Sequence, residues 1–315
     1  MNSESKVRFV EVDANYEGQR LDNFLIRELK GVPKSKIYRI LRKGEVRVNK
    51  KRSKPSDKLI AGDLVRIPPV RTSPATATVD PGQSLRDLLN RAILFEDDAL
   101  IVVNKPSGLA VHGGSGLSVG LIESMRAMRN QHDYLELVHR LDRETSGCLI
   151  IAKSRGALTR LHEDMRNGEI RKEYLALTEG KWPTHLSEVN APLQKNQLKS
   201  GERIVRVEQE GKASLTYFEV IKRLGSATLV KARLATGRTH QIRVHAQLSG
   251  HAILGDDKYG SSDTNREYKK QGLKRLFLHA SNLSFIHPLS EERIDIEAAL
   301  PEDLENILSI LGGDA

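Results

Sequence analysis

The sequence predicts a two-domain α+β protein, with a small N-terminal domain over residues 1–68, a connector over 69–92 and a larger domain over 93–315. Three observations lead to this prediction. The chain has 315 residues, more than the ~100–200 of a usual single domain. Its N-terminal part combines two helical patterns with strand-like alternation. A stretch rich in proline and threonine then separates it from short apolar runs that begin after Phe95.

The N-terminal domain is expected to contain two helices and a small sheet. Apolar side chains recur at helical spacing over residues 21–29, and again between Ser35 and Gly44, where lysine and arginine crowd the other positions. Residues 45–49 and 63–67 alternate at the period of a strand. These four elements fit within one small module.

The larger domain is expected to be rich in strands. Residues 68–81 contain proline, threonine and alanine without periodicity, which predicts an exposed connector. Strands are expected at the apolar runs 100–103, 149–152, 174–177, 213–220 and 227–234. Helices are expected around 158–165 and 239–247, and between Pro301 and Gly312 at the C-terminus.

Composition places the chain among folded proteins that can bind polyanions. Hydrophobic residues make up 38%, too many for a disordered chain, and 50 Lys+Arg against 41 Asp+Glu give a formal charge of +9, which favours a nucleic acid partner. The single cysteine, Cys148, lies in an apolar run and is expected to be a buried, inert thiol. No segment reaches the ~18 apolar residues of a membrane span, and the N-terminus lacks a signal-peptide core, so we expect a cytoplasmic protein without a membrane partner.

The most informative segment is His139–Gly147, which reads His-Arg-Leu-Asp-Arg-Glu-Thr-Ser-Gly and leads directly into an apolar strand. Polar side chains at a strand end are well placed to line a cleft. Two further motifs follow in order, Lys-Glu-Tyr-Leu-Ala at 172–176 and Thr-Gly-Arg-Thr-His-Gln-Ile-Arg-Val-His at 236–245. With these motifs the chain resembles the pseudouridine synthases of the large-subunit ribosomal RNA type. Similarity along the full length points to their C-type subfamily.

The N-terminal domain resembles the S4 RNA-binding module, through residues 20–25, 33–39 and 44–49. The two resemblances together imply an S4-like domain joined to a pseudouridine synthase fold, whose mixed, mainly antiparallel central sheet carries the active cleft. They also imply the function, which is isomerisation of specific uridines to pseudouridine in 23S ribosomal RNA by a monomeric enzyme.

The chemistry of this isomerisation requires few groups. The N1–C1′ bond of uridine must break, the uracil must turn while it stays bound, and C5 must join C1′. One carboxylate, a group near C5 to relay a proton and an enclosed pocket suffice, so neither cofactor nor metal is expected.

The resemblance assigns a role to each of four residues. Asp142 is the carboxylate, acting as nucleophile on the ribose or base or as the base that removes the C2′ proton; the sequence leaves these routes open. Arg243 orients Asp142 and keeps it ionised. Tyr174 packs against the uracil and serves in removing the C5 proton, while Arg140 enters the space left when the nucleotide turns out of its stack.

Further contacts to RNA are expected from basic residues of the S4-like domain and from the catalytic motif. These residues are Lys34, Lys36, Arg39, Arg42, Lys43 and Arg47, together with His139 and Arg140. The other histidines, His240, His245, His279 and His287, fall in no recognised ligand spacing, so no metal site is expected. Glu144 is expected to be solvated rather than half of a glycosidase-like carboxylate pair.

Two other classes of function compete with this interpretation. A non-catalytic ribosome-assembly factor could use the same S4 module and positive charge, but it would not need Asp142, Tyr174 and Arg243 together. A nuclease or RNA methyltransferase would need metal-binding carboxylates or a nucleotide-cofactor loop, neither of which the sequence contains in recognisable form.

Overall fold

The computed structural model describes residues 6–29, 31–70, 80–113, 119–129, 134–197 and 203–313. The N-terminal domain packs two helices on a four-stranded sheet of order β1-β4-β2-β3. Its elements are β1 (Arg8–Glu11), the 3-10 helix η1 (Ala14–Tyr16), α1 (Leu21–Glu28), α2 (Lys34–Arg42), β2 (Arg47–Val48), β3 (Lys51–Arg52) and β4 (Leu64–Ile67). Both expected helices form, because their apolar faces close a core that contains Phe24, Ile37 and Ile40.

The expected strand over 45–49 is shorter in the structure. Only Arg47 and Val48 pair with a neighbouring strand, because Asn49 and Lys50 adopt positive φ angles of 48° and 67° and turn the chain back into β3. Two consecutive residues of positive φ are the geometry of a tight hairpin turn. The expected strand at 63–67 forms as β4.

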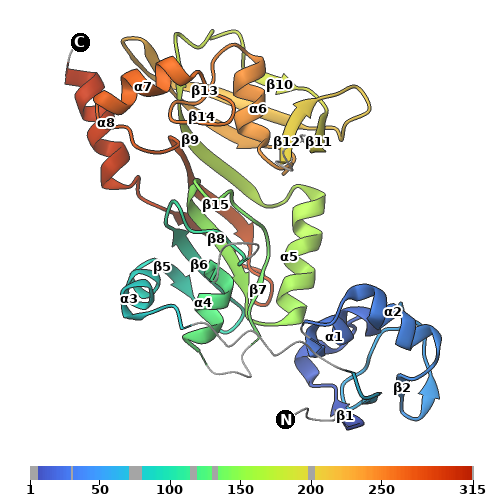
Figure 1. Cartoon of the computed structure of the whole chain (residues 1–315). Helices are drawn as coiled ribbons and strands as arrows, with labels where there is room; N and C mark the ends of the chain where they lie inside the picture. The colour runs from blue at the N-terminus through green and yellow to red at the C-terminus, as the bar shows by residue number, and fades with distance from the viewer. Residues whose placement is uncertain are drawn as a thin grey trace.

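The larger domain is built on a ten-stranded sheet that runs through the body of the molecule (Figure 1). Its main path is β10-β13-β14-β9-β15-β8-β6-β5, with β16 added on β15 and β7 on β8. These strands are β5 (Ile93–Glu96), β6 (Leu100–Lys105), β7 (Glu136–Leu137), β8 (Ser146–Ala152), β9 (Arg171–Glu179), β10 (Glu188–Asn190), β13 (Leu215–Leu224), β14 (Ala227–Leu234), β15 (Leu278–Ile286) and β16 (Arg293–Glu297). Within the described ranges, β8 with β15 is the one parallel pair of this sheet, so the expected mixed, mainly antiparallel sheet is confirmed.

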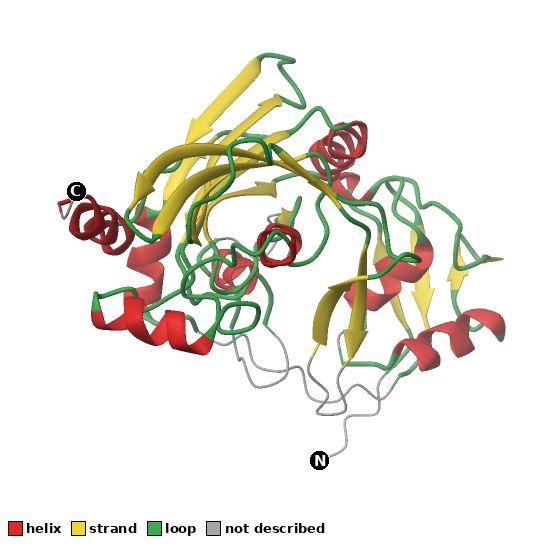
Figure 2. Cartoon of the chain, turned by 90° about the horizontal axis from the view of Figure 1, so that it is seen from above, coloured by secondary structure: helices red, strands yellow, loops and turns green. Residues whose placement is uncertain are grey.

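Helices and a small hairpin surround this curved sheet (Figures 1 and 2). The helices are α3 (Gln83–Arg91), α4 (Leu121–Ala127), α5 (Arg155–Asn167), α6 (Gln241–Leu248), α7 (Ser262–Lys270) and α8 (Glu302–Gly313). The strands β11 (Leu193–Gln197) and β12 (Arg203–Val207) form a separate two-stranded sheet next to α6. No helix within the described residues combines the length and the apolar character needed to cross a membrane.

Strand β8 is buried on both faces. Its side chains alternate between two cores, with Leu149 and Ile151 in one and Cys148 and Ile150 in the other. Cys148 is fully buried, as expected, and burial raises the pKa of its thiol to about 12. Because β8 is packed on both faces, the C-terminal end of the polar segment that precedes it is fixed.

The expected connector over 69–92 includes a helix in its second half. Residues 83–91 form α3, and Leu89 from this helix is fully buried in the same core as Ile101 and Val103. Leu85, Leu88 and Leu89 recur at helical spacing, which the charged and polar residues between them obscure in the sequence. The expectation for residues 71–79 lies outside the described residues.

The two domains meet where η1 packs near α5 (Figure 1). Arg155, at the start of α5, donates from its guanidinium to the carbonyl oxygens of Glu17 and Gly18, each at 3.1 Å. The rings of Tyr16 and Tyr134 lie 5.5 Å apart between their centroids. The S4-like domain is therefore in direct contact with the larger domain.

Candidate active site

Asp142 lies in a loop whose backbone is held by a buried lysine, Lys105. Lys105, which is fully buried, donates through Nζ to the carbonyl oxygens of Pro106, Leu109 and Arg143 at 2.8, 2.9 and 3.0 Å. The three hydrogens of an ammonium group match three acceptors. Ser107 Oγ donates to the Glu144 carbonyl oxygen at 2.7 Å. The backbone that follows Asp142 is thus fixed against the 106–109 segment.

The other end of this loop is fixed by Gly147. Gly147 has a φ of 109°, and a Cβ atom at this position would overlap the carbonyl oxygen of Ala280 in β15. Only glycine combines this backbone conformation with so close an approach of the neighbouring strand. The parallel pairing of β8 with β15 therefore sets where the loop ends and Ser146 begins the strand.

Arg243 of α6 contacts two carboxylates at different distances. Its Nε and Nη2 atoms donate to the two carboxylate oxygens of Asp256, both at 2.7 Å, and its Nη1 donates to Asp142 Oδ2 at 3.3 Å. Burial opposes the charge of Arg243, but the hydrogen bonds and charge of Asp256, with Asp142 after them, outweigh burial and raise the pKa of Arg243. The expected pair of Asp142 and Arg243 is present, and Asp256 is the stronger partner of the arginine.

Asp142 and Arg243 line a cavity of about 240 Å³, and Tyr174 belongs to the same lining. Tyr174 projects from β9 and is 6% exposed. Burial and, after it, the Asp142 carboxylate raise the pKa of Tyr174 well above its usual value. The three residues expected to be catalytic are thus brought together from a loop, a strand and a helix far apart in the sequence.

Three further residues of this site were not singled out from the sequence. Asp256 is one, and His240 is another: its Nε2 is 3.8 Å from Asp142 Oδ2, and its Nδ1 is 2.7 Å from the hydroxyl of Tyr259. The third is Lys172, on the same strand face as Tyr174. His240 and Lys172 lie inside the motifs at 236–245 and 172–176, which is the signal that could have found them, whereas Asp256 lies outside the three motifs.

The residues expected to contact RNA have different environments. Arg140 is exposed and lines the cavity. His139 lines it too, but its Nε2 accepts the backbone N–H of Ile150 at 3.2 Å, and burial, helped by the charge of Lys172, lowers the pKa of His139 to about 3. The ring of His139 therefore has a structural partner that the sequence did not reveal.

The basic residues of the S4-like domain lie at its surface. Lys34, Arg39, Arg42 and Lys43 are exposed and Lys36 and Arg47 are partly exposed. Glu144 is exposed, as expected. Across the described residues, no group of three or more His, Cys, Asp or Glu side chains is arranged to hold a metal ion.

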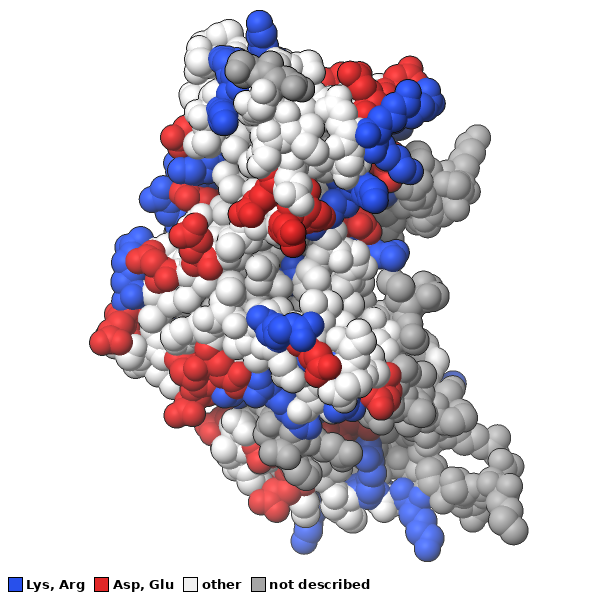
Figure 3. Space-filling model, turned by 90° about the vertical axis from the view of Figure 1, so that its left-hand side faces the viewer, with Lys and Arg blue, Asp and Glu red and all other residues white. Residues whose placement is uncertain are grey.

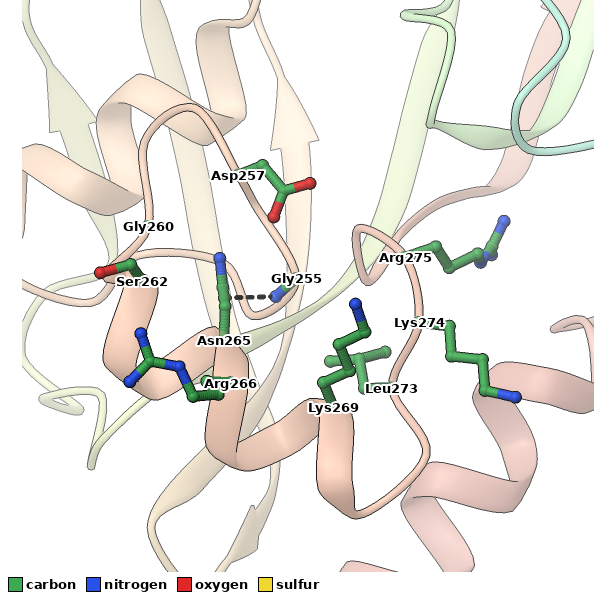
Figure 4. A pocket seen from close by; sticks show the side chains of 10 residues that line it. All are labelled: Gly255, Asp257, Gly260, Ser262, Asn265, Arg266, Lys269, Leu273, Lys274 and Arg275. Atoms are coloured by element: carbon green, nitrogen blue, oxygen red, sulfur yellow. Dashed lines mark hydrogen bonds between the residues drawn. The ribbon is translucent and has the colours of Figure 1, made fainter.

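A second pocket lies beside the turn that carries Asp256 (Figure 4). Its lining includes Arg266 and Lys269 of α7 and, after that helix, Lys274 and Arg275. In Figure 4 these four side chains point in different directions rather than toward one point. The pocket contains no counterpart of the Asp142, Tyr174 and Arg243 grouping, so the smaller cavity is the candidate active site.

Comparison with known proteins decides the family. Residues 99–248 match the family model described as RNA pseudouridylate synthase, and residues 19–65 match that of the S4 domain. A protein named ribosomal large subunit pseudouridine synthase C from Escherichia coli strain K12 is 56% identical over 97% of this chain and 97% of its own length. The chain belongs to the RNA pseudouridylate synthase family. It is therefore an isomerase and not a non-catalytic assembly factor.

Other relatives extend the same result. The protein of the same name from Haemophilus influenzae is 53% identical over 98% of this chain and 96% of its own length. Among solved structures, human RNA pseudouridylate synthase domain containing 4 superposes with a TM-score of 0.59 at 26% identity, covering 73% of this chain and 96% of that chain. The expected S4-like domain and the expected synthase fold are both confirmed.

Proposed function

We propose that this protein converts specific uridines of 23S, large-subunit ribosomal RNA to pseudouridine, with Asp142 as the carboxylate that acts on the target nucleotide. The observation that carries this proposal is the placement of Asp142 in a cavity with Tyr174 on one wall and Arg243 at 3.3 Å. The similarly named relatives that match nearly the whole chain support the choice of RNA.

Each residue of the site has a part in this chemistry. Arg243 is held by Asp256 and orients Asp142 through one long contact to Oδ2. The other carboxylate oxygen lies outside that contact and can reach the sugar or base. Tyr174 packs against the uracil. Its raised pKa keeps it as a neutral phenol, which favours packing over action as an ionised base. The isomerisation exchanges no electrons or groups with a second substrate, so these side chains suffice.

The target nucleotide must leave its base stack to reach this cavity, and Arg140 is placed at the cavity to occupy the space it leaves. The S4 domain would hold the RNA backbone through its exposed basic residues on α2. We propose that the enzyme acts as a monomer in the cytoplasm, where ribosomal RNA is made.

The experiment is tritium release from 23S ribosomal RNA transcribed with C5-tritiated uridine. Asp142→Asn keeps the shape of the side chain and removes its charge. We expect loss of tritium release by about 10³-fold or more, as for other residues that react directly with substrate, with RNA affinity unchanged. Turnover by Asp142→Asn at the wild-type rate would refute the role of this carboxylate.

A matched control comes from the same loop. Glu144 is an exposed carboxylate two residues away, and Glu144→Gln changes the net charge by the same amount. We expect Glu144→Gln to retain tritium release, because its side chain does not line the cavity.

A further inference from the structure

Lys172 is a buried cation in the candidate active site without a counter-charge. Its residue exposure is 9%, and it lines the cavity together with Asp142 and Tyr174. Within the described residues, the side chain of Lys172 forms neither a hydrogen bond nor an ion pair, while its backbone belongs to the pair of β9 with β15. Burial alone lowers the pKa of Lys172, since no carboxylate lies close enough to raise it. A desolvated ammonium without a partner is unfavourable in the free protein, which makes its presence here informative.

The surroundings of Lys172 leave room for a ligand. Lys172 and Tyr174 lie two residues apart on β9 and therefore face the same side of the sheet. Opposite Nζ lies Gly237, where a Cβ atom would come within 3.6 Å of the ammonium. Gly237 does not have a positive φ, so its backbone does not require glycine, and what its lack of a side chain provides is open space before Nζ.

We propose that Lys172 binds a backbone phosphate of the target uridine, with the ammonium contacting a phosphodiester oxygen next to the nucleotide that enters beside Asp142. This proposal rests on the proposed function, because it places the target uridine in this cavity. A phosphodiester carries a full negative charge and compensates the cation, whereas a uracil carbonyl is neutral and would leave it unmatched. Arg140 and Arg238 line the same cavity, so the approaching RNA backbone meets cations before it reaches Lys172.

The test is the salt dependence of binding, measured for the full chain with unmodified 23S ribosomal RNA transcript. Neutralising one phosphate contributes about 0.7–0.9 to the slope of log affinity against log salt. We expect Lys172→Met to weaken binding and lower the slope by this amount, and Lys172→Arg to restore both. Lys222→Met, at an exposed lysine of β13 outside the cavity, removes the same charge and should leave both unchanged.

Folding of the variant is checked by its thermal midpoint. Removing an unpartnered buried cation should leave the midpoint of Lys172→Met unchanged or raise it. An independent variant, Gly237→Ala, keeps the lysine and fills the space before Nζ; it should also weaken binding. The phosphate assignment would be overturned if Lys172→Met had the wild-type slope of log affinity against log salt, with or without a loss of turnover. Loss of tritium release in Lys172→Arg, at wild-type affinity, would do the same, because it would mean that Lys172 must give up a proton.

These results are separable from the proposed function. Binding slopes do not depend on catalysis, whereas the role of Asp142 is judged by tritium release from Asp142→Asn. If Asp142→Asn is inactive and the slope of Lys172→Met equals that of the wild type, the phosphate assignment alone fails. If Asp142→Asn turns over normally, the proposed function fails whatever the slope.

Discussion

Within the described residues, the nitrogen-bearing side chains of Arg243 and His240 approach the Asp142 carboxylate, and neither binds it tightly. Arg243 gives two of its donors to Asp256 at 2.7 Å and only one, at 3.3 Å, to Asp142. The Nε2 atom of His240 stays 3.8 Å away from the carboxylate. A carboxylate that must attack the substrate or accept a proton is better served by loose contacts, because every strong bond to it must weaken as its charge is lost.

The state of His240 is set by Tyr259. The Tyr259 hydroxyl accepts the backbone N–H of Val205 at 3.0 Å, so its own hydrogen is left for Nδ1 of His240. With the hydroxyl as donor, Nδ1 accepts and is unprotonated. His240 therefore carries its hydrogen on Nε2, the atom nearest Asp142.

Tyr259→Phe should raise the pKa of His240. In the native protein burial lowers this pKa most, Arg243 and Lys258 add to the effect, and Asp142 and Asp256 oppose it. Loss of the hydroxyl removes a bond that favours the neutral ring, so imidazolium appears at higher pH than before. NMR titration of ¹⁵N-labelled histidine checks this. The acid limb of the pH profile of tritium release should move to higher pH as well. An unchanged titration would show that Tyr259 does not control the ring.

The sequence predicted which side chains gather in the cavity better than it predicted how they pair. Asp142, Tyr174 and Arg243 stand in motifs and meet as expected. Asp256 accepts from both Nε and Nη2 of Arg243. This contact depends on the turn at Gly255, where a Cβ atom would overlap the carbonyl oxygen of Arg275. No local pattern encodes a contact between segments folded onto each other in this way.

At the scale of elements, some segments were predictable from the apolar surface that they bury, although β15 and α4, which are largely buried, were also missed. Strand β8 is buried on both faces and was expected, and α5, with a regular apolar face, was expected too. Helix α7 was missed because Tyr268 is its one buried residue, which leaves no apolar period to detect. Strand β1 was missed for a similar reason: none of its four residues is buried.

The pairing of β8 with β15 gives a prediction about stability. Gly147→Ala combines a positive φ with overlap of the Ala280 carbonyl, so β15 would have to move. We expect a loss of about 3 kcal/mol or more in the free energy of unfolding, at the level of other strained or overpacked sites. Urea unfolding measures it.

Gly168→Ala is the matched control. Gly168 also has a positive φ, 79°, at the end of α5, but a Cβ atom there meets nothing within 4 Å. Its cost should be that of the left-handed conformation alone, about 1–2 kcal/mol. Equal losses in the two variants would mean that the close approach of β15 contributes nothing.

At the scale of the whole molecule, the chain has a net charge of +9, but not every face is uniformly basic. The face shown in Figure 3 carries Lys and Arg interspersed with Asp and Glu. Basic side chains instead gather on α2 of the S4 domain, where Lys34, Lys36, Arg39 and Arg42 share one helix. Arg155 joins this domain to the start of α5, so α2 stands at a defined side of the catalytic domain, where it would hold the RNA that we propose it binds.

This division of labour predicts that affinity and chemistry can be changed separately. Arg39→Glu should weaken binding of 23S ribosomal RNA several-fold. It should also lower the slope of log affinity against log salt by about 0.7–0.9, because one phosphate contact is lost. The single-turnover rate of tritium release at saturating enzyme should stay at the wild-type value, because Arg39 is exposed in the other domain and does not line the cavity. Lys222→Glu imposes the same change in charge on β13 and should alter neither quantity. A fall in the saturating rate of Arg39→Glu would instead mean that the S4 domain helps to place the uridine at Asp142, and that the two domains act as one site.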